Sequence, residues 1–182
     1  MISREEAIEL VEEHVSNDNL VKHMIAVGAI MRSLAERFGE DPELWEAVGI
    51  LHDIDYEEVG EELEVHGLRS AEMVEDLLPE EGIHAIKAHN AMTGVEATSR
   101  MDLSLYSADA VSGMIVANAL VRPTGLKGMS PGSIKRRMND SSFAKQISRE
   151  DIRRCEDLEL DLNEFLKISV EAMQSVSDEI GL

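Results

Sequence analysis

Several residue types are scarce in this sequence. Its 182 residues include one cysteine, one tryptophan, two tyrosines and three phenylalanines. A single cysteine, Cys155, excludes a disulfide framework within the chain, which fits a reducing cytoplasm. With 3% aromatic residues but 43% hydrophobic residues, we expect a sizeable core filled by aliphatic side chains and by the ten methionines.

Long apolar runs and basic residues are also scarce. No apolar run approaches the roughly 20 residues that span a bilayer, and the N-terminus lacks the basic-then-apolar layout of a signal peptide. The 17 Lys and Arg face 37 Asp and Glu, for a net charge of −20. This balance favours solubility and argues against binding to a nucleic acid polymer or to an anionic membrane. From the single cysteine and the lack of a signal-peptide layout we expect a cytoplasmic protein.

The charges are unevenly distributed along the chain. Residues 36–81 contain 17 acidic residues against two arginines, whereas residues 110–139 contain no acid and five basic residues. Such a segment predicts a local positive field. A buried helix over residues 110–121 would also exclude charge, but it accounts for only the first dozen of these residues.

The spacing of apolar residues is typical of helices throughout, and no strand-like alternation is found. We therefore predict an all-α fold, as a single domain over residues 1–182. We expect its core over residues 20–121 and a C-terminal helical extension over 122–182. The expected helices cover residues 3–14, 20–39, 42–53, 65–78, 79–90 and 102–121, with shorter ones opened by Ser130-Pro131 and Ser148, and a last one from Asp161 to Gly181. We expect a polar loop over residues 56–64.

Polar residues stand at apolar positions of this pattern. His23 lies on the apolar stripe of the second expected helix, and His52-Asp53 end the third. Asp109 lies between two alanines in the most apolar helix, with no Lys or Arg within one turn. A buried, uncompensated carboxylate costs several kcal/mol, so a metal ion is an attractive partner for Asp109.

Two more histidines extend the set, because His66 stands near the start of the fourth expected helix and His89 near the end of the fifth. Each histidine alone fits an ordinary hydrogen-bonded residue. Together, these groups on successive helices favour a metal site, which helix bundles commonly build from side chains that project inward.

The order His23, His52-Asp53 and Asp109 resembles the metal-ligand signature of the HD superfamily of phosphohydrolases. The additional His66 and His89 resemble the subset with a second metal. The segments that look like a prokaryotic branch of predicted HD hydrolases are Leu51-His52-Asp53-Ile54-Asp55, Lys87-Ala88-His89-Asn90 and Tyr106-Ser107-Ala108-Asp109. Many relatives have Ile-Gly followed by a basic residue where this sequence has Ile54-Asp55. We therefore do not extend the cyclic-dinucleotide chemistry of those relatives to this chain.

The resemblance implies an HD-type helical bundle with one or two divalent transition-metal ions, Mn, Fe, Co, Ni or Zn. The first ion would be bound by His23, His52, Asp53 and Asp109, and Asp53 would bridge to a second ion held by His66 and His89. Such a metal activates a water for in-line attack on phosphorus. The implied activity is phosphomonoesterase or phosphodiesterase on a small nucleotide-like or phosphorylated metabolite.

Further site residues are expected around these ligands. Asp53 and Asp55 are catalytic candidates, although Asp55 fits a solvated loop equally well. A phosphate clamp for a small anionic substrate is expected from the basic segment, and the alternative is a solvated helix face. The residues of this expected clamp are Lys127, Lys135, Arg136 and Arg137.

Two other functions remain open at this point. Some HD-fold proteins use the same set of histidines and aspartates to hold two irons and activate oxygen. A non-catalytic helical domain that binds only a metal, a ligand or a partner is the other alternative.

Overall fold

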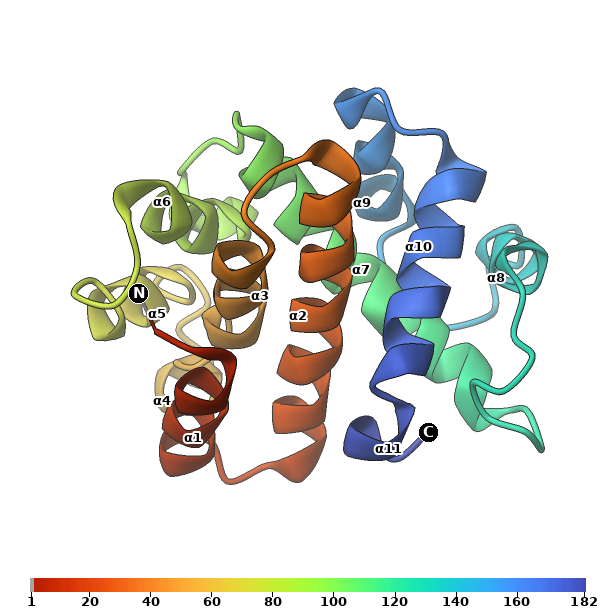
Figure 1. Ribbon diagram of the computed structural model, residues 1–182, viewed down its shortest axis with the longest axis horizontal. Helices are drawn as coiled ribbons and strands as arrows, with labels where there is room; N and C mark the ends of the chain where they lie inside the picture. The colour runs from red at the N-terminus through yellow and green to blue at the C-terminus, as the bar shows by residue number, and fades with distance from the viewer. Residues whose placement is uncertain (1) are drawn as a thin grey trace.

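Helices make up all the regular structure in the computed structural model, which describes residues 2–182 (Figure 1). The predicted all-α fold is thus confirmed. The helices are α1 (Arg4–His14), α2 (Asp18–Phe38), α3 (Pro42–Leu51), α4 (Tyr56–Val59), α5 (Leu68–Met73), α6 (Glu80–Ala88), η1 (Ala91–Thr93), α7 (Arg100–Leu120), α8 (Pro131–Met138), α9 (Arg149–Arg153), η2 (Arg154–Leu158), α10 (Leu162–Ser175) and α11 (Ser177–Ile180).

The α2–α3 hairpin is built from clear start and stop signals. α2 ends at Gly39, whose φ of 73° suits the left-handed cap that closes many helices. Asp41 then accepts hydrogen bonds from the first amides of α3, and Pro42 occupies the first helical position. A three-residue turn therefore sets the two helices side by side and antiparallel.

The two helices touch backbone to backbone at Gly28 and Gly49. A Cβ atom built on Gly49 would lie 2.8 Å from the Gly28 Cα and 2.9 Å from its nitrogen. Main-chain atoms cannot move aside as the end of a side chain can, so only glycine fits here. This contact sets the separation of α2 and α3.

α7 is the central helix of the bundle and contacts α2, α6, α8, α9, α10 and η2. Although we expected no such stretch, α7 is long enough and apolar enough, by length and composition, to cross a membrane. Of that stretch, 56% is buried inside the bundle, as is typical of a core helix. The C-terminal residues pack onto the same core through Phe165, Leu166 and Met173.

Three expected boundaries were wrong. The helix expected over 65–78 is only α5, because the chain turns at Gly67 with a φ of 88°. The loop expected over 56–64 contains α4, which forms because Glu58 and Val59 donate to the Asp55 carbonyl and Val59 is buried. The last expected helix breaks at Val176 into α10 and α11, and this bend buries Ile180.

We predict that Gly49→Ala destabilises the protein by about 1–3 kcal/mol or more, because the added methyl group forces α2 and α3 apart. Chemical denaturation of the purified variant measures this loss. Gly132→Ala is the matched control, because a Cβ on this α8 residue meets nothing closer than 3.9 Å; we expect it to be neutral or stabilising by about 0.5–1 kcal/mol. Equal stability of the two variants would contradict the proposed contact.

We also predict that Asp102→Asn lowers stability by about 1 kcal/mol at neutral pH. Asp102 is fully buried, and its carboxylate accepts hydrogen bonds from the Thr98 and Ser99 amides. Burial would raise the pKa of Asp102, but these hydrogen bonds outweigh it and lower the pKa. The ionised carboxylate therefore stabilises the fold above its unfolded pKa of about 4, and this stability is lost as the pH falls through the lower folded pKa. Denaturation between pH 2 and 7 should show a weaker pH dependence in the variant than in the parent.

Candidate metal centre

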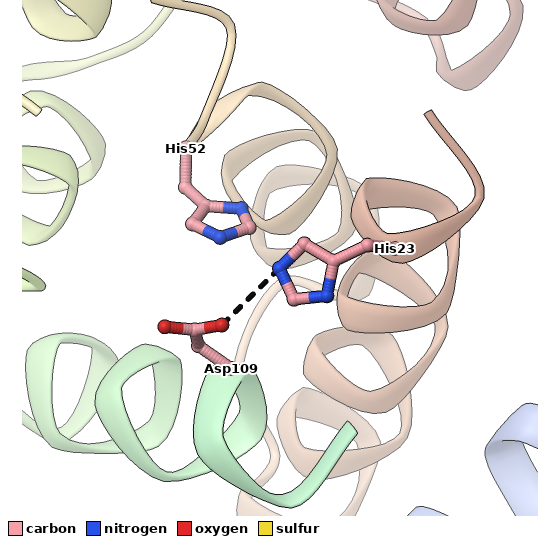
Figure 2. A group of neighbouring side chains, drawn as sticks. All are labelled: His23, His52 and Asp109. Atoms are coloured by element: carbon pink, nitrogen blue, oxygen red, sulfur yellow. Dashed lines mark ion pairs between the residues drawn. The ribbon is translucent and has the colours of Figure 1, made fainter. Parts of the chain in front are cut away.

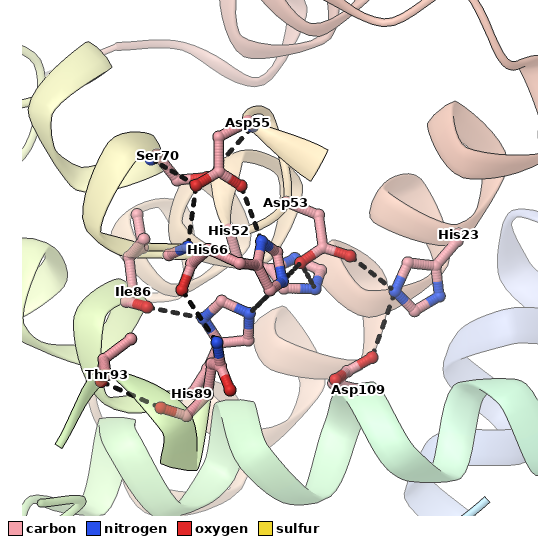
Figure 3. Close-up of polar contacts among 12 residues, drawn as sticks. His23, His52, Asp53, Asp55, His66, Ser70, Ile86, His89, Thr93 and Asp109 are labelled. Carbon is pink, nitrogen blue, oxygen red and sulfur yellow. Dashed lines mark hydrogen bonds and ion pairs between the residues drawn. The ribbon is translucent and has the colours of Figure 1, made fainter. Parts of the chain in front are cut away.

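The six predicted ligands converge at one place in the bundle (Figure 3). They come from five parts of the chain, and a pocket of about 520 Å³ opens onto them. His52 is fully buried behind the other five, which line the pocket. The ligands are His23 of α2, His52 and Asp53 at the end of α3, His66 in the turn before α5, His89 at the end of α6, and Asp109 of α7.

Helix ends orient two of the histidines. The last carbonyls of a helix lack an intrahelical partner. The His52 Nδ1 donates to the Gly49 carbonyl at 2.8 Å, and the His89 Nδ1 donates to the Ile86 carbonyl at 2.5 Å. A carbonyl only accepts, so in both rings Nδ1 carries the proton and Nε2 presents its lone pair.

Asp55 orients the third histidine. Its Oδ1 accepts from the His66 Nδ1 at 2.7 Å, while its Oδ2 accepts from the Gly67 and Ser70 amides at 2.8 and 2.9 Å. Asp55 is fully buried and does not line the pocket. The structure therefore does not support Asp55 as a catalytic acid or base; it fixes the ring and tautomer of His66, as carboxylates behind metal ligands do.

Ser112 orients the fourth histidine. The Ser112 hydroxyl donates to the Asp109 carbonyl at 2.8 Å, which uses its single proton. The His23 Nδ1 lies 3.2 Å from the same hydroxyl oxygen and must therefore be the donor. His23 thus also presents an Nε2 lone pair, which lies 3.1 Å from the Asp109 carboxylate (Figure 2).

The inward-facing atoms are therefore all acceptors when the histidines are neutral. The Nε2 atoms of His52, His66 and His89 each lie 3.2 Å from the Asp53 Oδ1, and the His23 Nε2 lies 3.6 Å from the Asp53 Oδ2. Among residues 2–182, the buried His52 Nε2 and Asp53 Oδ1 have no hydrogen-bond partner. Buried acceptors without donors are costly unless a cation binds them.

The spacing of these atoms fits a transition-metal ion. Neighbouring ligands lie about 3 Å apart around an ion with bonds of about 2.1 Å. Two groups of three residues each present ligand atoms that lie within 4.8 Å of one another. The first group is His23, His52 and Asp109, and the second is His52, Asp53 and His89. The donor set thus fits one or two divalent ions.

The electrostatics of the cluster favour positive charge at its centre. Burial lowers the pKa of His52 to about 4, which keeps this ring neutral. Burial also disfavours a charged His66, but the carboxylates of Asp53 and Asp55 beside its ring raise its pKa to about 10. For Asp53, burial would raise the pKa, yet the neighbouring histidines hold it well below its ordinary value. Asp53 is therefore an ionised carboxylate at neutral pH.

The expected phosphate clamp lies elsewhere, because none of its four residues lines this pocket. Lys135 donates to Asn163, and Arg137 donates to Asn118 on α7. Asn118 follows Asp109 by nine residues, which is half a turn in phase and about 14 Å along a helix. The structure therefore places these residues apart from the metal centre, with α7 between the two, and phosphate binding by them stays a prediction.

Residues that we did not predict complete the pocket. Tyr56 and Tyr106, the two tyrosines of the chain, line it together with Asn90 and Asp151. Asn90 caps η1 and also donates to the Leu63 and His66 carbonyls at 2.7 and 3.0 Å. It thereby fastens the turn that carries His66. The scarcity of aromatic residues was a signal that could have drawn attention to the two tyrosines.

Comparisons with known proteins agree with this geometry. The model of the HD domain family matches residues 20–114, a range that contains all six ligands. The chain belongs to the HD domain family. Ribonuclease Y of Enterococcus faecalis (strain ATCC 700802 / V583) is 32% identical over 147 residues, which cover 72% of this chain and 26% of the relative. This HD domain chain therefore spans about a quarter of the length of ribonuclease Y, and no solved structure matches it significantly.

Membership of the HD domain family supports a coarse function. It indicates a metal-dependent phosphohydrolase of a family that binds divalent metals, and the His and Asp cluster of this chain could hold such an ion. The resemblance noted from the order of His23, His52-Asp53 and Asp109 and from the segments around them is thus confirmed at the level of the family.

We predict that Asp55→Asn weakens metal binding by about 10- to 100-fold, because the ligand His66 loses its fixed orientation. Equilibrium dialysis against Mn²⁺ or Ni²⁺, followed by elemental analysis, measures the change. Glu58→Gln is the matched control, because Glu58 is an exposed acid of the adjoining helix α4 and does not line the pocket. Unchanged affinity in Asp55→Asn would contradict the positioning role of Asp55.

Proposed function

We propose that this HD domain hydrolyses phosphate esters of a small phosphorylated molecule at a centre of two metal ions. The observation that carries the proposal is the position of Asp53 between two groups of ligands. Its Oδ1 faces His66 and His89, while its Oδ2 faces His23 on the side of Asp109. A carboxylate placed in this way is suited to bridge two ions.

Each ion would have its own set of ligands. His23, His52, Asp53 and Asp109 would hold the first, and Asp53, His66 and His89 the second. Mixed nitrogen and oxygen donors suit Mn, Fe, Co, Ni or Zn. Such ions, when bound, lower the pKa of water and neutralise charge that develops on phosphoryl oxygens.

The residues of the chain orient this chemistry. Two carbonyls, a carboxylate and a hydroxyl behind the four histidines hold each Nε2 toward the centre, so little rearrangement is needed when a substrate enters. The pocket lining contains no Lys or Arg, so the charge of a bound phosphoryl group must be met by the metal ions. Phosphate should therefore bind at this site only when metal is present.

The size and charge of the pocket favour a small substrate. A volume of about 520 Å³ lies within the usual range for small-molecule sites, and the net charge of −20 disfavours a long polyanion. The relative ribonuclease Y is named for action on RNA, and RNA is a phosphodiester. Short oligoribonucleotides therefore belong in the substrate panel beside phosphate monoesters and cyclic nucleotides.

The experiment combines metal counting with activity. The purified protein is first analysed for metal, and then phosphate release from the panel is measured with that metal in anaerobic and aerobic buffer. We expect one or two transition-metal ions per chain and hydrolysis that does not require oxygen. Turnover that depends on oxygen, without phosphate release, would instead support a di-iron oxygenase.

We predict that Asp53→Ala abolishes both metal binding and hydrolysis, because both proposed ions lose a shared ligand. Metal content and initial rates are measured on the same preparation. Asp18→Ala is the control, since it removes an exposed carboxylate at the start of α2 that pairs with Lys22 and does not line the pocket. An Asp53→Ala variant that turns over at the parent rate would refute the assignment of this site.

A further inference from the structure

A second pocket lies on the other side of α7 from the metal centre. Its volume is about 410 Å³, and it is formed where the end of α7 meets α8. In Figure 1, α8 lies at the opposite side of the bundle from α5 and α6. Its lining residues are Asn118, Arg122, Ser133, Arg136, Arg137 and Asp140.

The arginines of this pocket differ from most others in the protein. Seven of the eleven arginines form ion pairs with carboxylates, in a chain that has 37 acidic residues to offer. Arg149 is unpaired because it donates to four backbone carbonyls. The other three without an ion pair among the described residues are Arg122, Arg136 and Arg137, and all three line this pocket.

Neutral partners hold two of these guanidinium groups in place. Arg122 donates to the Gly125 and Lys127 carbonyls at 3.0 and 2.9 Å. Arg137 donates to the buried Asn118 side chain at 3.0 Å, and its guanidinium lies 4.4 Å from the centre of the Phe143 ring. These contacts orient the groups but leave their charge uncompensated. Arg136 is exposed and forms no side-chain hydrogen bond or ion pair among the described residues.

The only acid in the lining, Asp140, offsets part of this charge. Its carboxylate accepts from the Ser142 amide and hydroxyl at 2.9 and 2.6 Å, and Arg137 lies close enough to contribute to lowering its pKa. Three guanidinium groups therefore face one carboxylate. The dipole of α8 favours basic residues in its last turn, but it does not explain why Arg122 joins them from a different segment.

We infer that this pocket binds the phosphate group of a small phosphorylated ligand, at a site separate from the metal centre. Planar guanidinium groups with free N–H donors match phosphate oxygens in geometry as well as in charge. The half-turn between Asp109 and Asn118 puts the two sites on opposite faces of α7, so one small molecule does not span both. The inference does not depend on the proposed hydrolysis.

The test is a titration of the full-length, ¹⁵N-labelled protein with inorganic phosphate, followed by two-dimensional NMR. We expect saturable shifts of the Asn118 side-chain amide and of the Lys135, Arg136 and Arg137 backbone amides. Arg136→Gln should weaken this binding about tenfold or more, and Arg136→Lys should weaken it less. Arg153→Gln, which removes an exposed arginine outside the pocket, should leave it unchanged.

Several results would overturn the inference. One is that chloride at equal ionic strength causes the same NMR shifts as phosphate. The others are shifts that do not saturate with phosphate, and phosphate binding that is unchanged in Arg136→Gln. Tighter binding of a short RNA to the same residues, steeply dependent on salt, would assign the pocket to nucleic acid instead. Phosphate bound at the metal centre would shift His66 and His89, so failure of one site leaves the other measurable.

Discussion

The contact between Gly28 and Gly49 is the constraint on which the arrangement of the centre depends. With no side chain between them, α2 and α3 lie as close as two helices can. His23 lies five residues before Gly28, and His52 lies three residues after Gly49. Because the helices are antiparallel, both histidines come to the same end of the contact. The Gly49 carbonyl also accepts the Nδ1 proton of His52, so the residue that sets the helix separation also orients a ligand.

A second constraint is the chemistry of the cluster itself. Its four histidines each donate through Nδ1 to a group behind them, and they turn their lone pairs toward two carboxylates. When all four rings are neutral, such an arrangement is unfavourable on its own, because nothing in it supplies a donor. It becomes favourable with positive charge at the centre. The stability of the fold and the binding of metal are therefore coupled, since an ion that binds the folded protein alone shifts the folding equilibrium.

Much of the fold and of the cluster followed from local signals. Capping residues such as Ser148 and Asp161 indicated helix starts, and Asp109 was visible as a carboxylate among apolar residues. The shortened α5 did not follow, because the turn at Gly67 depends on its packing against His89. The positioning role of Asp55 could not be read from the sequence either. Its hydrogen bonds to the Gly67 and Ser70 amides exist only once that turn has formed. The position of the basic segment did not follow from its charge. It depends on α7, where Asn118, the partner of Arg137, lies on the face opposite Asp109.

The distribution of the ligands along the chain also bears on how the protein is made. His23 and Asp109 are separated by most of the matched family range, and five of the six ligands precede α7. A nascent chain whose α7 segment is still inside the ribosome therefore carries the four histidines but lacks the helix that supplies Asp109. The centre is completed only after α7 has left the ribosome and packed onto α2 and α6. Loading with metal then reports that the whole helical core, and not a part of it, has assembled.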